Sequence, residues 1–113
     1  MKNSKNIQGE IILIEFPYSD LRQRKVRPAV ILSNSKYLGN DILVCGISSK
    51  TNSNLDIRIK KSDFIEGGLV FLSFIKNGKL VYVEKKLIIK RLGILKKEII
   101  EKVVENLVEI IGS

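Results

Sequence analysis

An arginine–proline pair stands at the start of an apolar strand in residues 25–33, which read KVRPAVILS. The proline biases Arg27 toward an extended backbone. Because Pro28 has no N–H, it is restricted to the start or the edge of a strand. Arg27 is therefore expected at the mouth of a strand, next to a basic loop over residues 21–26. At such a rigid position the planar guanidinium can bind a phosphate through two parallel hydrogen bonds.

The length of the chain indicates one domain. Its 113 residues are enough for a real core but not for two, so residues 1–113 are interpreted as a single domain with a flexible N-terminus over residues 1–7. No apolar run reaches the length that spans a bilayer. The N-terminus has basic residues without the hydrophobic stretch of a signal peptide behind them. We therefore expect a cytoplasmic protein.

The charge and the rare residue types limit the possible functions. A formal net charge of +8 and a pI near 9.7 favour a polyanionic partner, although a generally basic proteome would give the same balance. The chain contains no histidine, which removes the usual general acid–base residue and the commonest zinc ligand. The single cysteine, Cys45, excludes an internal disulfide and is expected to be a buried, inert thiol. Neither a metal nor another cofactor is predicted.

The first two-thirds of the chain read as short strands separated by polar breaks. Apolar runs and alternating patterns predict strands over residues 9–16, 28–34, 42–48, 55–59, 69–75 and 79–83. Loops, turns and a connector are expected over residues 17–26, 36–41, 50–54 and 62–68. Asn77-Gly78 lies between the last two predicted strands and is a strong signal for a hairpin turn.

The last third has helical periodicity. Over residues 96–111 the apolar side chains recur on one face, and the glutamates fall mostly on the other. This amphipathic helix is too acidic to be a good nucleic-acid surface. Several short strands followed by a terminal helix predict a mainly β fold, a small and strongly bent SH3-like barrel.

An ordered set of short motifs resembles the MazF/PemK family of toxin endoribonucleases from toxin–antitoxin systems. The motifs are Gly9-Glu10-Ile11-Ile12, Phe16-Pro17-Tyr18-Ser19-Asp20, Arg27-Pro28-Ala29-Val30, Ile47-Ser48-Ser49-Lys50 and the segments 62–69 and 87–93. The resemblance extends over about residues 8–111. It implies a type II toxin with an SH3-like/CcdB-like barrel, which cleaves single-stranded RNA, forms a homodimer and is inhibited by a cognate antitoxin.

The resemblance also assigns catalytic roles. Arg27 and Ser48 match the arginine and the threonine or serine that the family uses at the scissile phosphate. Arg27 would bind the non-bridging oxygens and Ser48 would donate a hydrogen bond to the same group. The products would carry 2′,3′-cyclic phosphate and 5′-hydroxyl ends. From the residues alone, Ser48 could instead only hydrogen-bond backbone at a strand end, and Arg27 could form a structural ion pair with Asp20 or Glu15.

The general base is the weakest point of the assignment. An arginine is essentially never deprotonated in a protein, and some relatives carry a carboxylate just before the Arg-Pro pair, where this chain has Arg22-Gln23-Arg24-Lys25. The nearest carboxylate is Asp20, which becomes the candidate base. Where relatives often have arginine, this chain has Lys76, which keeps the charge without the bidentate geometry.

The candidate RNA-binding residues surround this site. They are Tyr18, Arg22, Arg24, Lys25, Ser49, Lys50 and Lys76. Tyr18 could stack on an unpaired base, and Ser49 is also an alternative to Ser48.

Two other functions stay open beside the nuclease. A related toxin family with this kind of barrel inhibits DNA gyrase, although a gyrase inhibitor would not need Arg27 and Ser48. A barrel that binds RNA without turnover is the third possibility. The apolar strand over residues 69–75 and the adjacent apolar pairs of the helix exceed what one small core needs. This surplus favours a two-fold homodimer, and the basic surface suits an acidic antitoxin tail that folds on binding.

Overall fold

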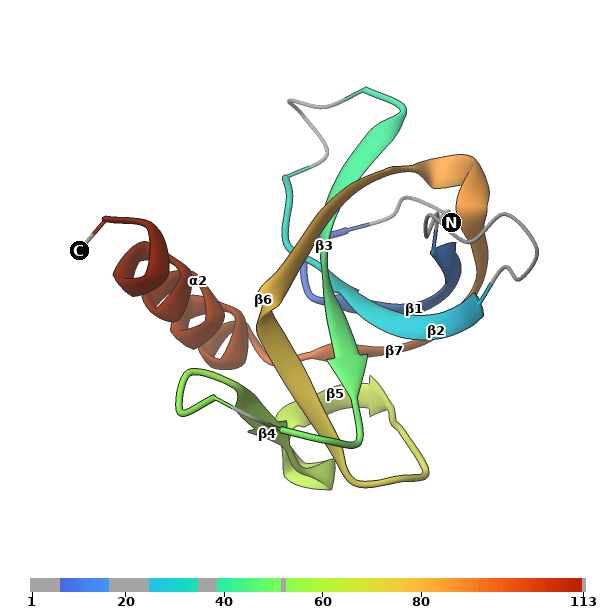
Figure 1. Cartoon of the computed structure of the whole chain (residues 1–113). Coiled ribbons are helices and arrows are strands. Elements are labelled where there is room, and N and C mark those ends of the chain that lie inside the picture. The colour runs from blue at the N-terminus through green and yellow to red at the C-terminus, as the bar shows by residue number, and fades with distance from the viewer. Residues whose placement is uncertain (1–6, 17–24, 35–38, 52, 113) are drawn as a thin grey trace.

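The computed structural model describes residues 7–16, 25–34, 39–51 and 53–112 (Figure 1). The strands are β1 (Glu10–Phe16), β2 (Lys25–Ile31), β3 (Asp41–Ser48), β4 (Ile57–Ile59), β5 (Phe64–Gly67), β6 (Ser73–Glu84) and β7 (Ile88–Leu95), and the helix is α2 (Lys97–Gly112). Two 3-10 turns, Lys61–Asp63 and Lys85–Leu87, precede β5 and β7. The expected N-terminal flexible segment lies outside the described residues except for Ile7.

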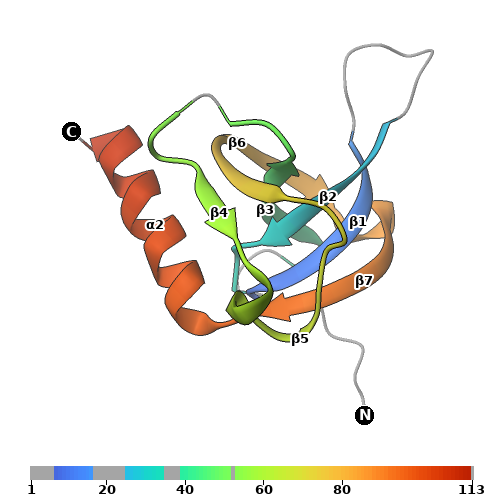
Figure 2. The ribbon, with the colours of Figure 1, turned by 90° about the horizontal axis from the view of Figure 1, so that it is seen from below.

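All seven strands belong to one sheet in the order β4-β6-β3-β2-β1-β7-β5, and its neighbouring strands pair antiparallel. The sheet curls strongly: the upper part of β6 arches over β1 and β2, and the chain returns as β7, which passes beneath these two strands in Figure 1, while α2 lies alongside β4 (Figure 2). The prediction of a mainly β, strongly bent barrel with a terminal helix is confirmed. None of the helices described here has the length and apolar character needed to cross a membrane.

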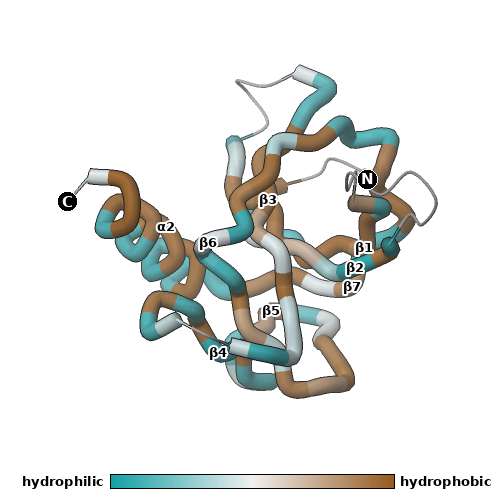
Figure 3. The backbone as a smooth tube through the Cα atoms, in the orientation of Figure 1, coloured by the Kyte–Doolittle hydropathy of each residue, from teal (hydrophilic) through white to brown (hydrophobic). Residues whose placement is uncertain are grey.

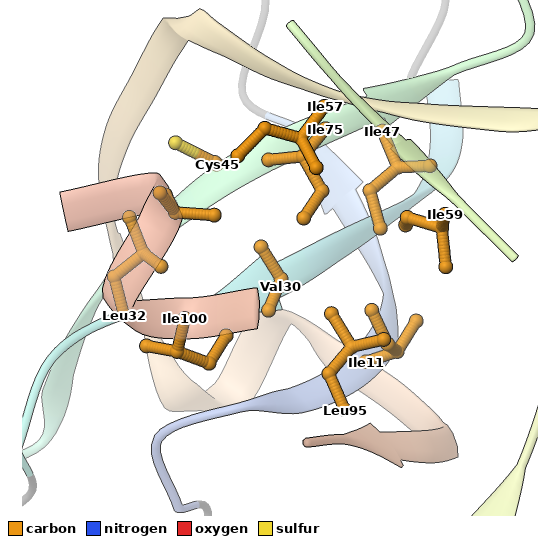
Figure 4. Packing of buried hydrophobic residues seen from close by; sticks show 11 residues of the cluster. Ile11, Val30, Leu32, Cys45, Ile47, Ile57, Ile59, Ile75, Leu95 and Ile100 are labelled. Atoms are coloured by element: carbon orange, nitrogen blue, oxygen red, sulfur yellow. The ribbon is translucent and has the colours of Figure 1, made fainter. Parts of the chain in front are cut away.

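Alternating side chains give the curled sheet a hydrophobic core on each face. On β1, Ile11 joins a first core that the sheet forms with Ile100 and Val103 of α2 (Figure 4). Ile12 and Ile14 point to the other face and join a second core inside the curl. Full burial of each of these aliphatic side chains stabilises the fold by about 1.5–3 kcal/mol. The predicted strand over residues 9–16 is confirmed with both of its faces covered.

The terminal helix is confirmed almost to its predicted ends. Its buried residues are Ile100 and Val103, and the amide of Asn106 donates a hydrogen bond of 3.0 Å to the carbonyl of Leu55. The helix therefore covers the first core and holds the segment before β4. A second apolar stripe stays exposed on α2, made of Val104, Val108 and Ile111, and Ile110 is exposed beside it.

The predicted hairpin at Asn77-Gly78 is wrong. β6 runs through these residues, and β3 pairs with both of its halves: Ile47 lies opposite Ile75, and Cys45 lies opposite Leu80. Two residue steps on β3 thus face five steps on β6, so the extra residues form a large bulge. The long strand β3 offers partners to both halves of β6, and this non-local pairing overrides the local turn preference of the Asn-Gly pair.

The other differences from the predicted elements also involve partners distant in sequence. Residues 69–72 were expected to be part of a strand, but they precede β6 and leave Val70 92% and Phe71 79% exposed. Residues 64–67 form β5, although a connector was expected there. At Gly67 the φ angle is +74°, and a Cβ would lie 2.2 Å from the carbonyl oxygen of Leu92. Only glycine permits this close pairing of β5 with β7.

A charged cluster joins the strands at this edge of the sheet. The guanidinium of Arg91 in β7 lies 3.2 Å from the carboxylate of Glu10 in β1 and also pairs with Glu66 in β5. Glu10 is only 4% exposed. Burial raises the pKa of its carboxyl group, and the nearby Arg91 partly opposes that effect. The cluster therefore has a structural role: the positive charge of Arg91 partly offsets the free energy cost of burying the carboxylate of Glu10.

Candidate functional site

Arg27 lies on β2, and Ser48 ends the neighbouring strand β3. β2 and β3 pair through Ala29 opposite Gly46. The same antiparallel register, continued by two residues, sets Arg27 opposite Ser48, the last residue of β3. Pro28 lies between Arg27 and Ala29 on β2. It has no N–H to donate to β3, which agrees with its position where the β2–β3 pairing ends. The expected position of Arg27 at the start of the strand is wrong, because β2 begins at Lys25 and Arg27 pairs with Ile14 of β1. Arg27 lies instead just beyond the point where the β2–β3 pairing ends.

The alignment continues across two more strands. Ser48 pairs with Phe74 of β6, and Phe74 pairs with Arg58 of β4. Directly paired residues of an antiparallel sheet share a face. The four residues Arg27, Ser48, Phe74 and Arg58 consequently form one row across β2, β3, β6 and β4, which we name the transverse row.

The transverse row lies on the face opposite the first core. The residues adjacent to it in sequence, Ile47, Ile75 and Ile57, are all buried in that core. Side chains alternate along a strand, so those of the row point to the other side. On β3 this side is the one that carries Val44 into the second core, and the row therefore lies at the rim of the curl.

Both arginines of the transverse row are exposed. Among the described residues, no carboxylate forms an ion pair with Arg27 or Arg58. The structural ion pair with Glu15 that the sequence allowed for Arg27 is thus not present, while Asp20 lies outside the described residues. Two unpaired guanidinium groups on one face form a suitable surface for phosphates.

The hydroxyl of Ser48 has one of its hydrogen-bonding functions occupied. Its oxygen accepts a hydrogen bond of 3.2 Å from the backbone N–H of Lys50, which is the local contact expected of a serine at a strand end. A hydroxyl group also has one proton to donate. The contact therefore orients Ser48 and leaves its donor capacity for another group. Ser49, the alternative, is exposed beyond the end of β3.

Lys76 has a structural partner. It is 8% exposed, and its ammonium lies 2.8 Å from the carboxylate of Asp56, whose side chain is 2% exposed. The same carboxylate oxygen accepts a hydrogen bond of 2.9 Å from the hydroxyl of Thr51. The pair thus ties the loop between β3 and β4 to the bulge of β6. RNA binding by Lys76 stays a prediction, but its ammonium already serves this buried pair.

The bulge brings a different cation, Lys79, to the rim. Gly46 has the same facing direction as Ser48, two residues along β3. A Cβ built on Gly46 would lie 3.5 Å and 3.6 Å from Cβ and Cδ of Lys79, and 3.8 Å from Cζ of Phe16. The stem of the exposed Lys79 and the ring of Phe16 therefore cover Gly46 beside the transverse row. Sequence reasoning missed Lys79, because its position depends on the bulge.

The remaining candidate residues lie around the rim or outside the described segments. Lys25 begins β2 opposite Phe16 and is exposed, as is Lys50. Tyr18, Asp20, Arg22 and Arg24 belong to residues 17–24, outside the described residues.

The described part of the chain offers neither a metal-binding cluster nor a reactive thiol. Its His, Cys, Asp and Glu residues form no group of three or more that could hold a metal ion. Cys45 is fully buried, as predicted for an inert thiol. Burial raises its pKa to about 12, and a thiol that stays protonated is a poor nucleophile.

The family model described as "PemK-like, MazF-like toxin of type II toxin-antitoxin system" matches residues 7–111. No curated protein matches the chain.

Solved structures share the fold over nearly the whole chain. MazF from Deinococcus radiodurans superposes with a TM-score of 0.74 at 15% identity, covering 98% of this chain and 100% of that one. An endoribonuclease bound to its cognate antitoxin, from a mycobacterial species, gives a TM-score of 0.71 at 14% identity, with 98% and 96% coverage. A MazE–MazF complex from Deinococcus radiodurans gives 0.72 at 14% identity, with 97% and 98% coverage.

Proposed function

Because the chain belongs to the PemK-like and MazF-like toxins of type II toxin–antitoxin systems, we propose that it is a metal-independent endoribonuclease that cleaves single-stranded RNA. The observation that carries the proposal is the β2–β3 register, which, continued by two residues beyond Ala29 and Gly46, sets Arg27 opposite Ser48 at the start of the transverse row. An exposed guanidinium and an oriented hydroxyl then face the same phosphate. One of the structures with this fold is an endoribonuclease by its name, which supports the same activity here.

In the proposed reaction the 2′-oxygen of a ribose attacks the adjacent phosphorus, and the bond from phosphorus to the 5′-oxygen breaks. The products are a 2′,3′-cyclic phosphate and a 5′-hydroxyl, whose oxygen takes up a proton from solvent as it leaves. Arg27 binds the non-bridging oxygens through two N–H groups and stabilises the charge that builds up on them. The hydroxyl of Ser48 donates a hydrogen bond to the same phosphate and fixes its orientation, which lowers the entropic part of the barrier.

The proton of the 2′-hydroxyl needs an acceptor. Asp20 is the candidate, since arginine does not lose its proton in proteins and the chain has no histidine. The exposed Lys25 and Lys50 near the rim would bind neighbouring phosphates, together with Arg22, Arg24 and Ser49. Tyr18 would stack on a base. Lys76 would act indirectly, by holding the loop that begins at Ser49.

The proposal includes two protein partners. The exposed stripe of α2 and the segment Val70-Phe71-Leu72 are strongly apolar (Figure 3), which favours a homodimer. An acidic antitoxin segment would compete with RNA for the basic rim. Two of the similar structures contain an antitoxin.

The test is incubation of the purified protein with a long single-stranded RNA in the presence of a chelator. Cleavage with cyclic phosphate ends, lost in Arg27→Ala and Ser48→Ala, is the expected result. Cleavage that requires added magnesium would refute the metal-independent mechanism. Binding without cleavage would indicate an RNA-binding module, and inhibition of gyrase supercoiling without RNA cleavage would indicate the other toxin class.

A further inference from the structure

We infer that Phe74 and Arg58 extend the RNA site across the sheet, with an unpaired base stacked on Phe74 and a phosphate bound by Arg58. The inference rests on the proposed function, because it assumes that RNA is bound at Arg27. The RNA strand would run across the β-strands along the transverse row, from β2 toward β4.

The first support is the position of Phe74. It is half-buried, yet it packs in neither of the two hydrophobic cores. Its pairing with Ser48 on one side and Arg58 on the other places its ring on the side of the sheet that faces away from the first core. A phenylalanine on an open sheet face between hydrogen-bond donors is the arrangement in which unpaired bases stack on proteins.

The second support is the charge at the far end of the row. Arg58 lies on β4, the edge strand of the sheet, and its neighbours Ile57 and Ile59 are buried on the opposite face. Arg58 is exposed and has no ion-pair partner in the described part of the chain. A cation fixed on a strand without a carboxylate partner is available for an anionic ligand.

The spacing of the row fits a short piece of RNA. Three steps between strands separate Arg27 from Arg58, which is about 14 Å at about 4.8 Å for each step. A stacked strand advances about 3.4 Å for each nucleotide, so the row spans at most about four nucleotides. Arg27 and Arg58 are thus far enough apart to bind different phosphates, and the ring of Phe74 between them meets an intervening base.

The experiment measures binding separately from cleavage. A fluorescently labelled 2′-O-methyl RNA of mixed sequence cannot be cleaved by attack of a 2′-hydroxyl, and its anisotropy reports the Kd at several salt concentrations. Phe74→Leu is expected to weaken binding about tenfold, the typical effect of losing one stacked base. Phe74→Tyr should restore it, because a tyrosine ring also stacks. Arg58→Gln is expected to weaken binding and to reduce the log–log salt slope by about 0.7, the contribution of one phosphate contact to single-strand binding.

Matched controls lie elsewhere on the same chain. Tyr82→Leu removes an aromatic side chain that is 58% exposed on β6, opposite Leu43 of β3 and outside the row. Lys90→Gln removes an exposed cation of β7, which pairs with Leu13 on the face of β1 that also carries Ile11. Both controls should bind RNA like the unaltered protein. Thermal unfolding of every variant detects any loss of fold, and recovery in Phe74→Tyr distinguishes stacking from packing.

The outcomes separate this inference from the proposed function. If the unaltered protein cleaves RNA while Phe74→Leu and Arg58→Gln bind like the controls, the extended site is refuted and the nuclease stands. If the unaltered protein neither binds nor cleaves RNA, the proposed function fails, and the extended site fails with it. A salt slope that stays the same in Arg58→Gln would refute the phosphate contact even if the affinity fell.

Discussion

Breaking the ion pair between Asp56 and Lys76 should destabilise the protein strongly. The side chains of the two residues are 2% and 10% exposed, and Nζ and Oδ2 lie 2.8 Å apart. Asp56→Ala leaves the ammonium buried without its carboxylate, a change that typically costs about 3–5 kcal/mol. The unfolding entropy of a 113-residue chain is about 0.24 kcal/mol/K. We therefore expect the Tm to fall by about 12–20 °C.

Replacement of both partners provides the matched comparison. In Asp56→Leu/Lys76→Met no charge remains buried, and such apolar replacements of buried pairs are often neutral or stabilising. The double variant should therefore unfold within about 1 kcal/mol of the unaltered protein, apart from the lost hydrogen bond of Thr51. Circular dichroism during heating gives the Tm, and urea titration gives the free energy of unfolding. A loss below about 1 kcal/mol in Asp56→Ala would refute the reasoning, because the ammonium would then not be desolvated.

The same double variant tests what Lys76 does for RNA. If the lysine only holds the loop between β3 and β4, the folded double variant should bind RNA with an unchanged salt slope. A slope reduced by about 0.7 would mean that Lys76 contacts a phosphate directly, despite its burial in the free protein.

Four further changes have defined outcomes. Arg27→Ala and Arg27→Lys should each lower kcat about 100-fold or more, because the guanidinium stabilises the charge of the transition state. Their circular dichroism should be unchanged, since the side chain is exposed. Near-normal cleavage would refute the binding of the phosphate by Arg27. Lys79→Gln should weaken RNA binding and lower the salt slope by about 0.7 without changing the Tm, whereas an unchanged slope would place the ammonium away from RNA. Glu10→Gln should become more stable relative to the unaltered protein as the pH rises above 4.5. Because the pKa of Glu10 is raised in the folded state, its carboxyl group ionises first in the unfolded chain, and the unaltered protein loses stability until the pH passes the folded-state pKa. Urea titrations at low and neutral pH measure the difference in stability, and a constant difference would contradict this reasoning. Asn77→Leu should leave the free energy of unfolding unchanged or raise it, since Asn77 is 2% exposed and its side-chain amide atoms have no hydrogen-bond partner in the described structure. Ile75→Ala is the comparison and should lower that free energy by about 2–5 kcal/mol. An equally large loss in Asn77→Leu would mean that the amide of Asn77 has a partner.

Elements whose signal is local could be predicted from the sequence. The apolar run of β1 and the helical periodicity of α2 persist in the structure because burial of their apolar faces agrees with their local pattern. β5 and β7 were missed because their pairing depends on contacts between distant segments. At Gly67 and Gly93, for example, two glycines allow the strands to approach closely. Nothing in either segment alone indicates that partner.

The candidate site divides in the same way. The family resemblance, together with the Arg-Pro pair and the end of an apolar strand, singled out Arg27 and Ser48. The local pattern placed Ser48 at the end of β3 correctly but placed Arg27 too close to the start of its strand. Phe74 and Arg58 carry no such mark. Their relation to Ser48 exists only through the register of β3, β6 and β4, and a shift of one residue would turn them to the opposite face.

The bulge of β6 explains why the strongest turn signal of the chain does not form a turn. A hairpin at Asn77-Gly78 would pair residues 69–75 with residues 79–83 and leave β3 only one of these two segments as a partner. In the structure, β3 pairs with both halves of β6 instead. The bulge has a free energy cost, because the side-chain amide of Asn77 is buried there without a hydrogen-bond partner in the described structure. The arrangement buries Lys76 against Asp56 and brings the stem of Lys79 over Gly46. The residues that violate the local rule are thus those that shape the rim of the candidate site, and departures from local preference often occur at such sites.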